Sequence, residues 1–272
     1  MSVPGHASPF SDLARKRDLW WQFTVRAVET RHRGSYLGWV WAILNPLLML
    51  AIYVVVFGII FGGHFGRLRD ETSTDFVLAV FLGLIIYHLL AETISTAPAV
   101  VVSQPNLVKK VVFPLDVLPL AQVGAFWFHF LISLGLMLAG ALFFGRGLSL
   151  SGICWLPVIL LPLLLMSVGI GWMIAALGVF FRDLAQAMPF VAQIMLYASA
   201  IFYPLARIPG GLWTFLKWNP LLHIVELARD ALLWDLPVNL LHLGYTYACG
   251  LVIFALGRWI FLKLQPAFAD VI

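Results

Sequence analysis

One stretch decides the fold of this chain, and it reads Arg26-Ala-Val-Glu-Thr-Arg-His-Arg-Gly-Ser-Tyr-Leu-Gly-Trp-Val-Trp-Ala-Ile-Leu-Asn-Pro46. Four basic or potentially basic side chains, Arg26, Arg31, His32 and Arg33, come directly before a long apolar run. Positive charges beside an apolar segment favour the cytoplasmic side of a membrane. The stretch therefore predicts a chain that is held at a membrane surface and then enters the bilayer.

The residues just upstream predict an amphipathic helix. Its polar side is a stripe with helical spacing, made of Asp18, Gln22, Arg26, Glu29 and Arg33. The opposite side carries Leu19, Trp20, Phe23 and Ala27. Ser11 suits the N-cap, and Gly34 suits the left-handed position that follows a helix. We therefore expect a helix that lies in the membrane interface over residues 11–33.

The composition indicates an integral membrane protein. Of the 272 residues, 62% are hydrophobic and 11% are charged, which leaves too little polar surface to cover a soluble globule. The net charge is +4 and the basic residues sit beside apolar runs, so anionic lipid headgroups are better candidate partners than nucleic acid. Cys154 and Cys249 lie in apolar runs without metal-ligand spacing, and we predict no metal site and no redox role. The N-terminal region lacks the apolar core of a cleavable signal peptide, so we expect it to be retained.

Five interruptions divide the remaining sequence into six apolar segments, each near the length of about 20 residues that crosses a bilayer. We place these spans at residues 38–62, 76–98, 117–143, 153–180, 187–204 and 238–262. With both termini in the cytoplasm, eleven of the 17 lysines and arginines lie inside, as the positive-inside rule favours. The sequence thus predicts an all-α integral membrane protein in which residues 1–272 form a single transmembrane domain.

Two segments between the predicted spans are expected to form short helices. Residues 103–114 form a compact cytoplasmic element, in which Pro105 opens a short helix and Pro114 ends it. An ordinary loop with topology-setting lysines is the alternative. Residues 205–235 are apolar but interrupted by glycine and proline, and they predict two short re-entrant or interfacial helices on the outer side.

Two glycine pairs lie within the predicted spans. Gly58 and Gly62 are spaced to let a second helix approach closely. Gly169-Ile-Gly171 begins like a dinucleotide-binding fingerprint, but it lacks the third glycine and the preceding strand. We interpret it as a helix-packing site.

The sequence lacks the usual motifs for nucleotide, zinc and acyl chemistry. The predicted spans hold few ionisable residues, chiefly His88, Glu92 and His129, whereas an ion-coupled carrier normally places more of them near the midplane. We therefore expect a transporter that draws its driving force from another subunit, with the histidines in structural roles and Glu92 as the stronger functional candidate.

Several motifs resemble, in order, those of one family. They are the run from Arg33 to Pro46, the run from Asn106 to Pro114 with Leu118-Pro119, Phe181-Arg-Asp-Leu184, and Asn219-Pro220 through Arg229. The chain is similar over essentially its whole length to ABC-2-type permeases that export polysaccharide, the O-antigen and capsule exporters of the Wzm kind.

That resemblance implies a homodimer of permeases in the bacterial inner membrane, with two copies of an ATP-binding cassette subunit that hold ATP and magnesium. The implied cargo is a glycan linked to undecaprenyl pyrophosphate. The chain itself would be a transport subunit without enzymatic activity or cofactor. Residues 103–114 would be the coupling helix, with Asn106, Lys109, Lys110 and Phe113 beside the ATPase, and residues 205–235 the periplasmic gate.

Two groups of residues are candidates for binding this substrate. Arg26, Arg31, Arg33 and Tyr36 are placed to bind the pyrophosphate, although such a basic cluster can also serve topology alone. The candidates for a sugar pathway are the aromatic residues Trp39, Trp41, Tyr53, Phe57, Phe190, Tyr197, Phe202 and Tyr203. Aromatic residues at span ends also form interfacial belts.

Two other functions stay open at this point. One is an ABC-2 permease for another cargo, such as capsule, teichoic acid, a lipid or a drug. The other is a membrane-embedded lipid-modifying enzyme, which would need an acid–base pair beyond Glu92.

Overall fold

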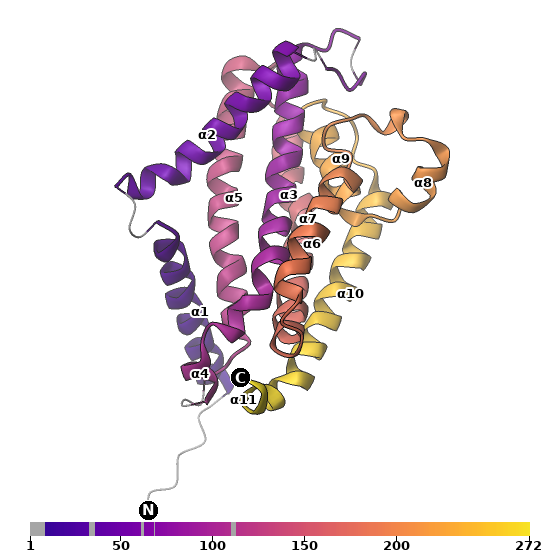
Figure 1. Cartoon of the computed structure of the whole chain (residues 1–272). Coiled ribbons are helices and arrows are strands. Elements are labelled where there is room, and N and C mark those ends of the chain that lie inside the picture. Colours follow the sequence, from indigo (N-terminus) through magenta and orange to yellow (C-terminus); the bar gives the residue numbers. More distant parts are fainter. Residues whose placement is uncertain (1–8, 33–35, 61–62, 68, 110–112) are drawn as a thin grey trace, which may run out of the picture.

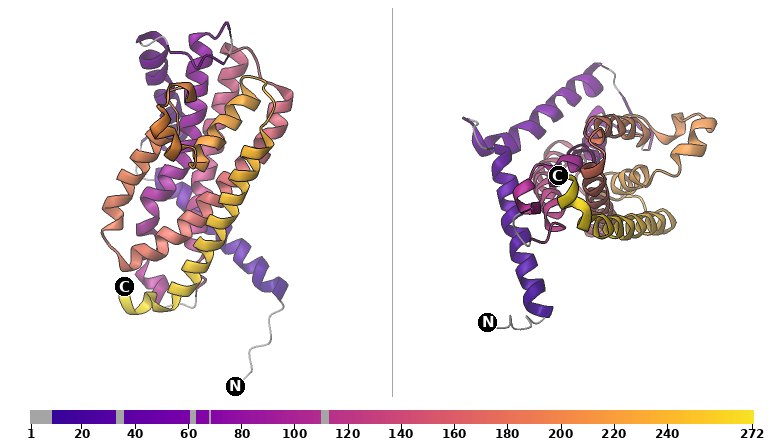
Figure 2. Two further views of the ribbon diagram at one scale, coloured as in Figure 1. Left: turned by 90° about the vertical axis from the view of Figure 1, so that its right-hand side faces the viewer. Right: turned by 60° about the horizontal axis from the view of Figure 1, so that its bottom comes forward.

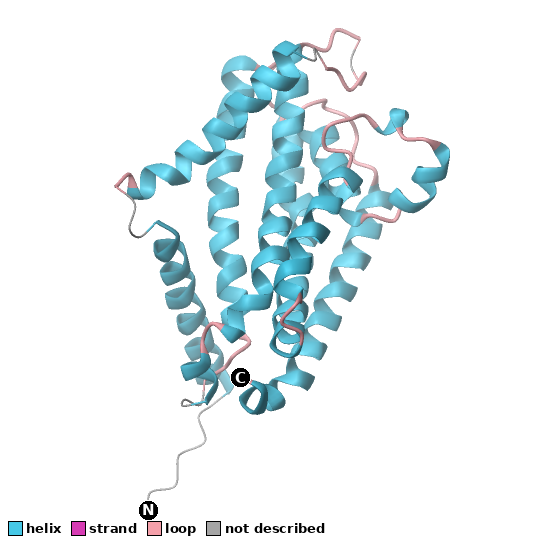
Figure 3. Cartoon of the chain, in the orientation of Figure 1, coloured by secondary structure: helices cyan, strands magenta, loops and turns pink. Residues whose placement is uncertain are grey.

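The structure is a computed structural model that describes residues 9–32, 36–60, 63–67, 69–109 and 113–272. Throughout these residues the regular structure is helical, as the sequence predicts (Figure 3). The α-helices are α1 (Pro9–His32), α2 (Trp41–Tyr53), α3 (Ser73–Val102), α4 (Pro105–Lys109), α5 (Val117–Phe144), α6 (Leu150–Phe180), α7 (Leu184–Ala198), α8 (Gly210–Leu216), α9 (Pro220–Leu232), α10 (Leu240–Leu264) and α11 (Phe268–Val271).

Within the described residues, five helical segments are long and apolar enough to cross a membrane. They are Gly38–Ile60, which is α2 with its 3-10 and π extensions, Ser73–Val102, Val117–Phe144, Leu150–Phe180 and Leu240–Val271. They match five of the six predicted spans. The sixth, residues 187–204, begins within α7, which has 15 residues and is shorter than a span. At 1.5 Å per residue it is roughly 22 Å long, against about 30 Å of hydrocarbon.

Helix α7 ends at Ala198, before the apolar run does. The Ala198 carbonyl accepts a hydrogen bond from the side-chain amide of Asn219 at 3.0 Å. Ala200 has a positive φ of 50°, which takes the chain out of the helix, and the carbonyl groups of Ala200 and Ile201 accept from the side chain of Arg229. Apolar composition extends to Tyr203, but the helix does not, since side chains take the place of backbone partners for these carbonyl groups.

Helix α3 is the centre of the bundle, and α5, α6, α7 and α9 pack around it (Figure 1). Thr72 and Asp75 form a capping box at its start, which satisfies exposed backbone N–H groups. The apolar window of α3 is 83% buried, whereas that of the first span has no buried residue. Figure 2 accordingly shows α1 and α2 outside the compact group of the other long helices.

Glycines bring helix backbones together where the sequence predicted packing sites. A Cβ atom on Gly169 would lie 2.5 Å from the carbonyl oxygen of Ile253 on α10, and one on Gly257 would overlap the carbonyl oxygen of Gly169. This confirms Gly169 as a helix-packing residue. Gly58 faces Val77 of α3, with 3.0 Å between the ideal Cβ position and the Val77 Cγ2 atom, so the closely approaching helix belongs to the same chain. Gly62 lies outside the described residues.

Helix α1 lies where the sequence predicts an amphipathic helix over residues 11–33, and its position in a membrane interface stays a prediction. Of its polar stripe, Asp18, Gln22, Arg26 and Glu29 are exposed, while Leu19, Trp20, Phe23 and Ala27 are half-buried. The apolar side packs on α5 of the same chain: the Trp20 indole donates to the carbonyl of Leu120 at 3.2 Å, and Thr24 lies against Gly124. Helices α4 and α11 lie at the same end of the bundle, which we call the basal end, and α8 and α9 lie toward the opposite end (Figure 1).

Candidate functional site

A cavity of about 540 Å³ with polar and apolar walls lies between α1, α3 and α5 toward the basal end. Its polar lining residues come from all three helices and from the turn after α3: they are Arg26, Thr30, Arg31, Glu92, Thr96, Ser103, Gln104 and Gln122. We call this space the headgroup cavity. The rest of its wall is apolar, as the interior of a helix bundle requires.

Arg31 and Glu92 form a two-point ion pair in the wall of this cavity. One terminal nitrogen of Arg31 donates to Glu92 Oε2 at 2.8 Å, and the other donates to Oε1 at 2.6 Å. The side chains are 41% and 32% exposed, so water reaches both of them. Hydrogen bonding to Glu92 raises the pKa of Arg31, while burial acts in the opposite direction. Arg31 is therefore charged at every physiological pH.

A second cavity of about 410 Å³ lies deeper, between α2, α3 and α5. We call it the inner cavity. Its lining includes Trp41, Asn45, Tyr53, His88, His129 and Ser133. Arg31, Glu92 and Phe126 line both cavities, so the ion pair stands where the two spaces meet.

The structure brings together some of the predicted headgroup residues. Arg26 and Arg31 both line the headgroup cavity. Tyr36 is fully exposed and lines neither cavity, and Arg33 lies outside the described residues. The pairing of Arg31 with Glu92, 61 residues away, was not predicted, because no local spacing relates a surface helix to the middle of a distant span.

The aromatic candidates divide into separate groups. Trp41 and Tyr53 line the inner cavity, and the rings of Tyr53 and Phe202 are 6.1 Å apart. The Trp39 ring packs edge-on against Phe128 of α5 at 6.0 Å. Phe190 and Tyr197 lie on the exposed surface of α7, and the Tyr203 hydroxyl donates to the Tyr197 carbonyl. The side chain of Phe57 lies outside the described residues. No single lining within the described part of one chain contains all of them.

The short basal helix is present as α4. Asn106 and Lys109 are exposed on it, and Lys110 lies outside the described residues. Phe113 packs on Phe23 of α1, with ring centroids 5.1 Å apart, and its place beside the ATPase stays a prediction. This contact joins the element of residues 103–114 to the helix that carries Arg31.

At the opposite end, Arg229 of α9 is fully buried. It donates to the carbonyl groups of Ala79 at 2.9 Å, Ala200 at 3.1 Å and Ile201 at 2.7 Å, and to Glu226 at 3.0 Å. The second oxygen of Glu226 accepts from Arg67 at 2.6 Å. The guanidinium also lies 4.5 Å from the Phe65 ring centroid. This side chain fastens α3, the end of α7 and α9 to one another.

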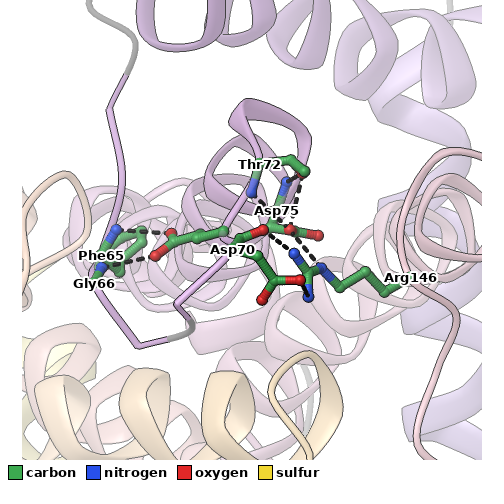
Figure 4. A network of polar contacts seen from close by, with 7 residues as sticks. Phe65, Gly66, Asp70, Thr72, Asp75 and Arg146 are labelled. Carbon is green, nitrogen blue, oxygen red and sulfur yellow. Dashed lines mark hydrogen bonds and ion pairs between the residues drawn. The ribbon is translucent and has the colours of Figure 1, made fainter.

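A second polar network holds the loop before α3 (Figure 4). Arg146 donates to Asp75 and to Asp70, each at 3.0 Å. Glu71 accepts from the backbone N–H groups of Phe65 and Gly66, both at 2.7 Å. Hydrogen bonding to Arg146 lowers the pKa of the exposed Asp70 carboxyl. These bonds order a loop that has no helix of its own.

Among the described residues, no three His, Cys, Asp or Glu side chains are grouped to hold a metal ion. The arrangement instead offers an arginine-lined polar cavity that adjoins apolar surface. Such a cavity suits an amphiphile with an anionic headgroup, because the guanidinium fork binds phosphate and carboxylate oxygens in pairs.

Comparisons with known proteins agree on one family. Residues 18–233 match the sequence model of a family described as ABC-2 type transporter. The chain is 27% identical over 255 residues to the O-antigen export system permease protein RfbA of Klebsiella pneumoniae, covering 94% of this chain and 95% of that one. It is 27% identical over 212 residues to the polysialic acid transport protein KpsM of Escherichia coli, covering 77% and 79%. A permease protein RfbA of Myxococcus xanthus is 27% identical over 72% of each chain.

Proposed function

Because the chain belongs to the ABC-2 type transporter family, we propose that it is the membrane subunit of an exporter of lipid-linked polysaccharide. The cargo is a glycan of the O-antigen type joined to undecaprenyl pyrophosphate, and the membrane is the bacterial inner membrane. Relatives named as O-antigen export permeases support this proposal, since they align over nearly the whole chain.

The observation that carries the proposal is the position of Arg31 in the headgroup cavity, with Arg26 beside it. A diphosphate offers several anionic oxygens, and a guanidinium can bind two of them through paired, charge-assisted hydrogen bonds. The cavity adjoins α1, the helix that leads into the first span. The lipid tail then stays in the bilayer while the pyrophosphate is bound at headgroup depth.

ATP hydrolysis takes place on two copies of a separate ATP-binding cassette subunit. The basal end is the cytoplasmic end in this proposal, because the predicted inside loops hold most of the lysines and arginines. Both termini then face the cytoplasm. The exposed Asn106 and Lys109 of α4 contact the ATPase, and the contact of Phe113 with Phe23 links that surface to α1.

The glycan passes between two copies of the chain. The first span has no buried residue in its apolar window, and α7 exposes Phe190 and Tyr197. These surfaces are free for the partner copy and for a pathway lined by aromatic residues, on which sugar rings stack. On the opposite side, α8 and α9 form the periplasmic gate, and Arg229 ties α9 to the segment after α7.

Export of a capsule polysaccharide is the second candidate, and the similarity to two polysialic acid transport proteins favours it. The two cargoes are distinguished by the polymer that accumulates inside cells when the gene is deleted. An intracellular lipid-linked O-antigen supports the first candidate, and an intracellular capsule polymer supports the second.

The test of the headgroup site is Arg31→Lys in the complex reconstituted with its ATPase. Lysine keeps the charge that sets topology but loses the fork, so insertion stays normal while stimulation of ATPase activity by the lipid-linked glycan falls about tenfold, or 1.4 kcal/mol. Basal ATPase activity changes less. Arg17→Lys, on an exposed part of the same helix, is the control. If the lipid-linked glycan stimulates Arg31→Lys as strongly as the wild type, Arg31 serves only to set the membrane topology.

A further inference from the structure

Glu92 occupies the same groups of Arg31 that a phosphate needs. Its two carboxylate oxygens accept from the two terminal nitrogens, at 2.8 Å and 2.6 Å. Carboxylate and phosphate compete for this fork because both present paired oxygens at similar spacing. An anionic headgroup therefore binds Arg31 fully only after Glu92 has left it.

His88 provides a second partner for the displaced carboxylate. It precedes Glu92 by four residues on α3, so the two side chains lie on the same face of the helix. The Nε2 atom of His88 is buried and makes no hydrogen bond to any described residue. A buried polar atom without a partner costs about 1–3 kcal/mol. His88 and Glu92 both line the inner cavity, which leaves space for the carboxylate to turn toward the imidazole.

We propose that Glu92 is a built-in competitor that keeps Arg31 occupied until a diphosphate headgroup displaces it, after which the Glu92 carboxylate accepts a hydrogen bond from His88. The proposal rests on the proposed function, because it assigns the headgroup cavity to a diphosphate. In the closed state Arg31 binds Glu92, and the Nε2 atom of His88 makes no hydrogen bond to a described residue. In the open state Arg31 binds the headgroup and His88 binds Glu92.

The exchange selects between anionic lipids. A membrane contains many phospholipids with a single phosphate, and an unoccupied arginine fork at headgroup depth would bind them continuously. Displacing Glu92 lowers the affinity of every anion by a similar factor, so only the headgroup with the greatest charge and the most oxygens still binds appreciably. The exchange thus sets a threshold of affinity that headgroups with a single phosphate do not reach. Because Arg31 and Glu92 line both cavities, their separation also joins the headgroup cavity to the inner cavity.

The experiment measures binding of farnesyl diphosphate and farnesyl monophosphate to the purified full-length chain in detergent. The central variant is Glu92→Gln, which keeps the shape of the side chain and removes its charge. We expect Glu92→Gln to bind both probes at least tenfold more tightly than the wild type, because the same competitor is removed for each of them. At a low probe concentration the monophosphate then occupies the variant but not the wild type. Glu29→Gln removes the same charge from an exposed site on α1 that lines neither cavity, and it leaves both affinities unchanged.

A double-mutant cycle tests the role of His88. His88→Phe removes the second partner of Glu92, so it weakens diphosphate binding several-fold in the wild-type background. The same substitution has no effect in Glu92→Gln, where there is no carboxylate to stabilise. The interaction between the two substitutions isolates the contact of His88 with Glu92.

Three results separate the competing explanations. If Glu92→Gln has the wild-type melting temperature and binds both probes no more tightly than the wild type, Glu92 is not a competitor. If Arg31→Gln binds the diphosphate as well as the wild type does, the headgroup site itself is wrong. Loss of binding in Arg31→Gln together with unchanged binding in Glu92→Gln rejects only the competitor. Should Glu92→Gln fail to fold, Glu92→Asp is the second variant. It keeps the charge but is one methylene shorter and reaches Arg31 less well, so we expect a smaller gain in affinity.

Discussion

The arginine–glutamate pairs Arg31–Glu92 and Arg229–Glu226 lie at opposite ends of the bundle and differ in what surrounds them. Arg31 and Glu92 are partly exposed and have each other as hydrogen-bonding partners. Arg229 is fully buried, and it binds three backbone carbonyl groups as well as Glu226. The first pair can exchange its partner for water or a ligand at small cost. The second can do so only at a large cost, because Arg229 is fully buried and would leave three carbonyl groups and a carboxylate oxygen without it.

The largest effect is expected when Arg229 is replaced. Arg229→Met fits the apolar surroundings but leaves Glu226 and three carbonyl groups short of a donor. Removing one partner of a buried pair costs about 3–5 kcal/mol, so we expect a much lower melting temperature in detergent and poor recovery of the folded chain. Arg207→Met, at an exposed arginine, is the control. A loss below about 1 kcal/mol would mean that Arg229 does not fasten this end of the bundle.

The space for Arg229 depends on Gly83 of α3. A Cβ atom at this position would lie 2.6 Å from a terminal nitrogen of Arg229 and 3.2 Å from Val225 Cγ1. That nitrogen is held by the Ile201 carbonyl at 2.7 Å, so it moves only by losing a hydrogen bond. We expect Gly83→Ala to destabilise the fold by about 1–3 kcal/mol. Gly135→Ala on α5 meets no atom within 4 Å and should be neutral or stabilising by up to about 1 kcal/mol. Equal melting temperatures for the two variants would contradict this assignment.

Breaking the basal pair should have a smaller effect on stability. Glu92→Gln removes the charge of a carboxylate whose side chain is 32% exposed, and ion pairs in contact with water contribute about 0–1 kcal/mol. We expect a loss of no more than about 1 kcal/mol in the free energy of unfolding. A loss as large as that of Arg229→Met would show that the pair is a structural tie, and it would remove the contrast between the two ends.

The smallest effect belongs to the exposed pair of Asp70 with Arg146. Arg146 lowers the pKa of Asp70 in the folded chain, so the pair stabilises the fold above the unfolded pKa of about 3.9. That contribution is lost as the pH falls through the lower pKa of the folded state. The melting temperature of Asp70→Asn should therefore decline less steeply below about pH 4 than that of the wild type. At neutral pH the two melting temperatures should be nearly equal. An equally steep decline in the variant would show that Asp70 does not contribute to it.

The sequence predicted those features that depend on one segment at a time. Periodic polar residues predicted the helix over 11–33, apolar runs of sufficient length predicted five spans, and Pro105 predicted the start of α4. It did not predict the end of α7 at Ala198, because the carbonyl groups there bind the side chains of Asn219 and Arg229, which come much later in the chain. Hydrophobic composition indicates which residues avoid water, but it does not identify the hydrogen-bonding partners of a buried arginine.

The candidate site was predicted only in part for the same reason. Arg26 and Arg31 share a cavity, as expected from their common place before the first span. Tyr36 lines neither cavity, and Arg31 pairs with Glu92. Both outcomes depend on how α1 packs against α3 and α5. Glu92 was a functional candidate because it is an ionisable residue within a predicted span. The sequence around a single carboxylate does not identify its partner.

The contact of α6 with α10 has a practical consequence for measuring motion. At Gly169 and Gly257 the two backbones touch without intervening side chains, so neither helix can slide along the other without steric overlap. The two helices therefore form a fixed frame. Spin labels for distance measurements by electron resonance are best placed with one label on exposed positions of this frame, such as Leu251, and the other on α2. A change in their separation would then report displacement of the first span alone.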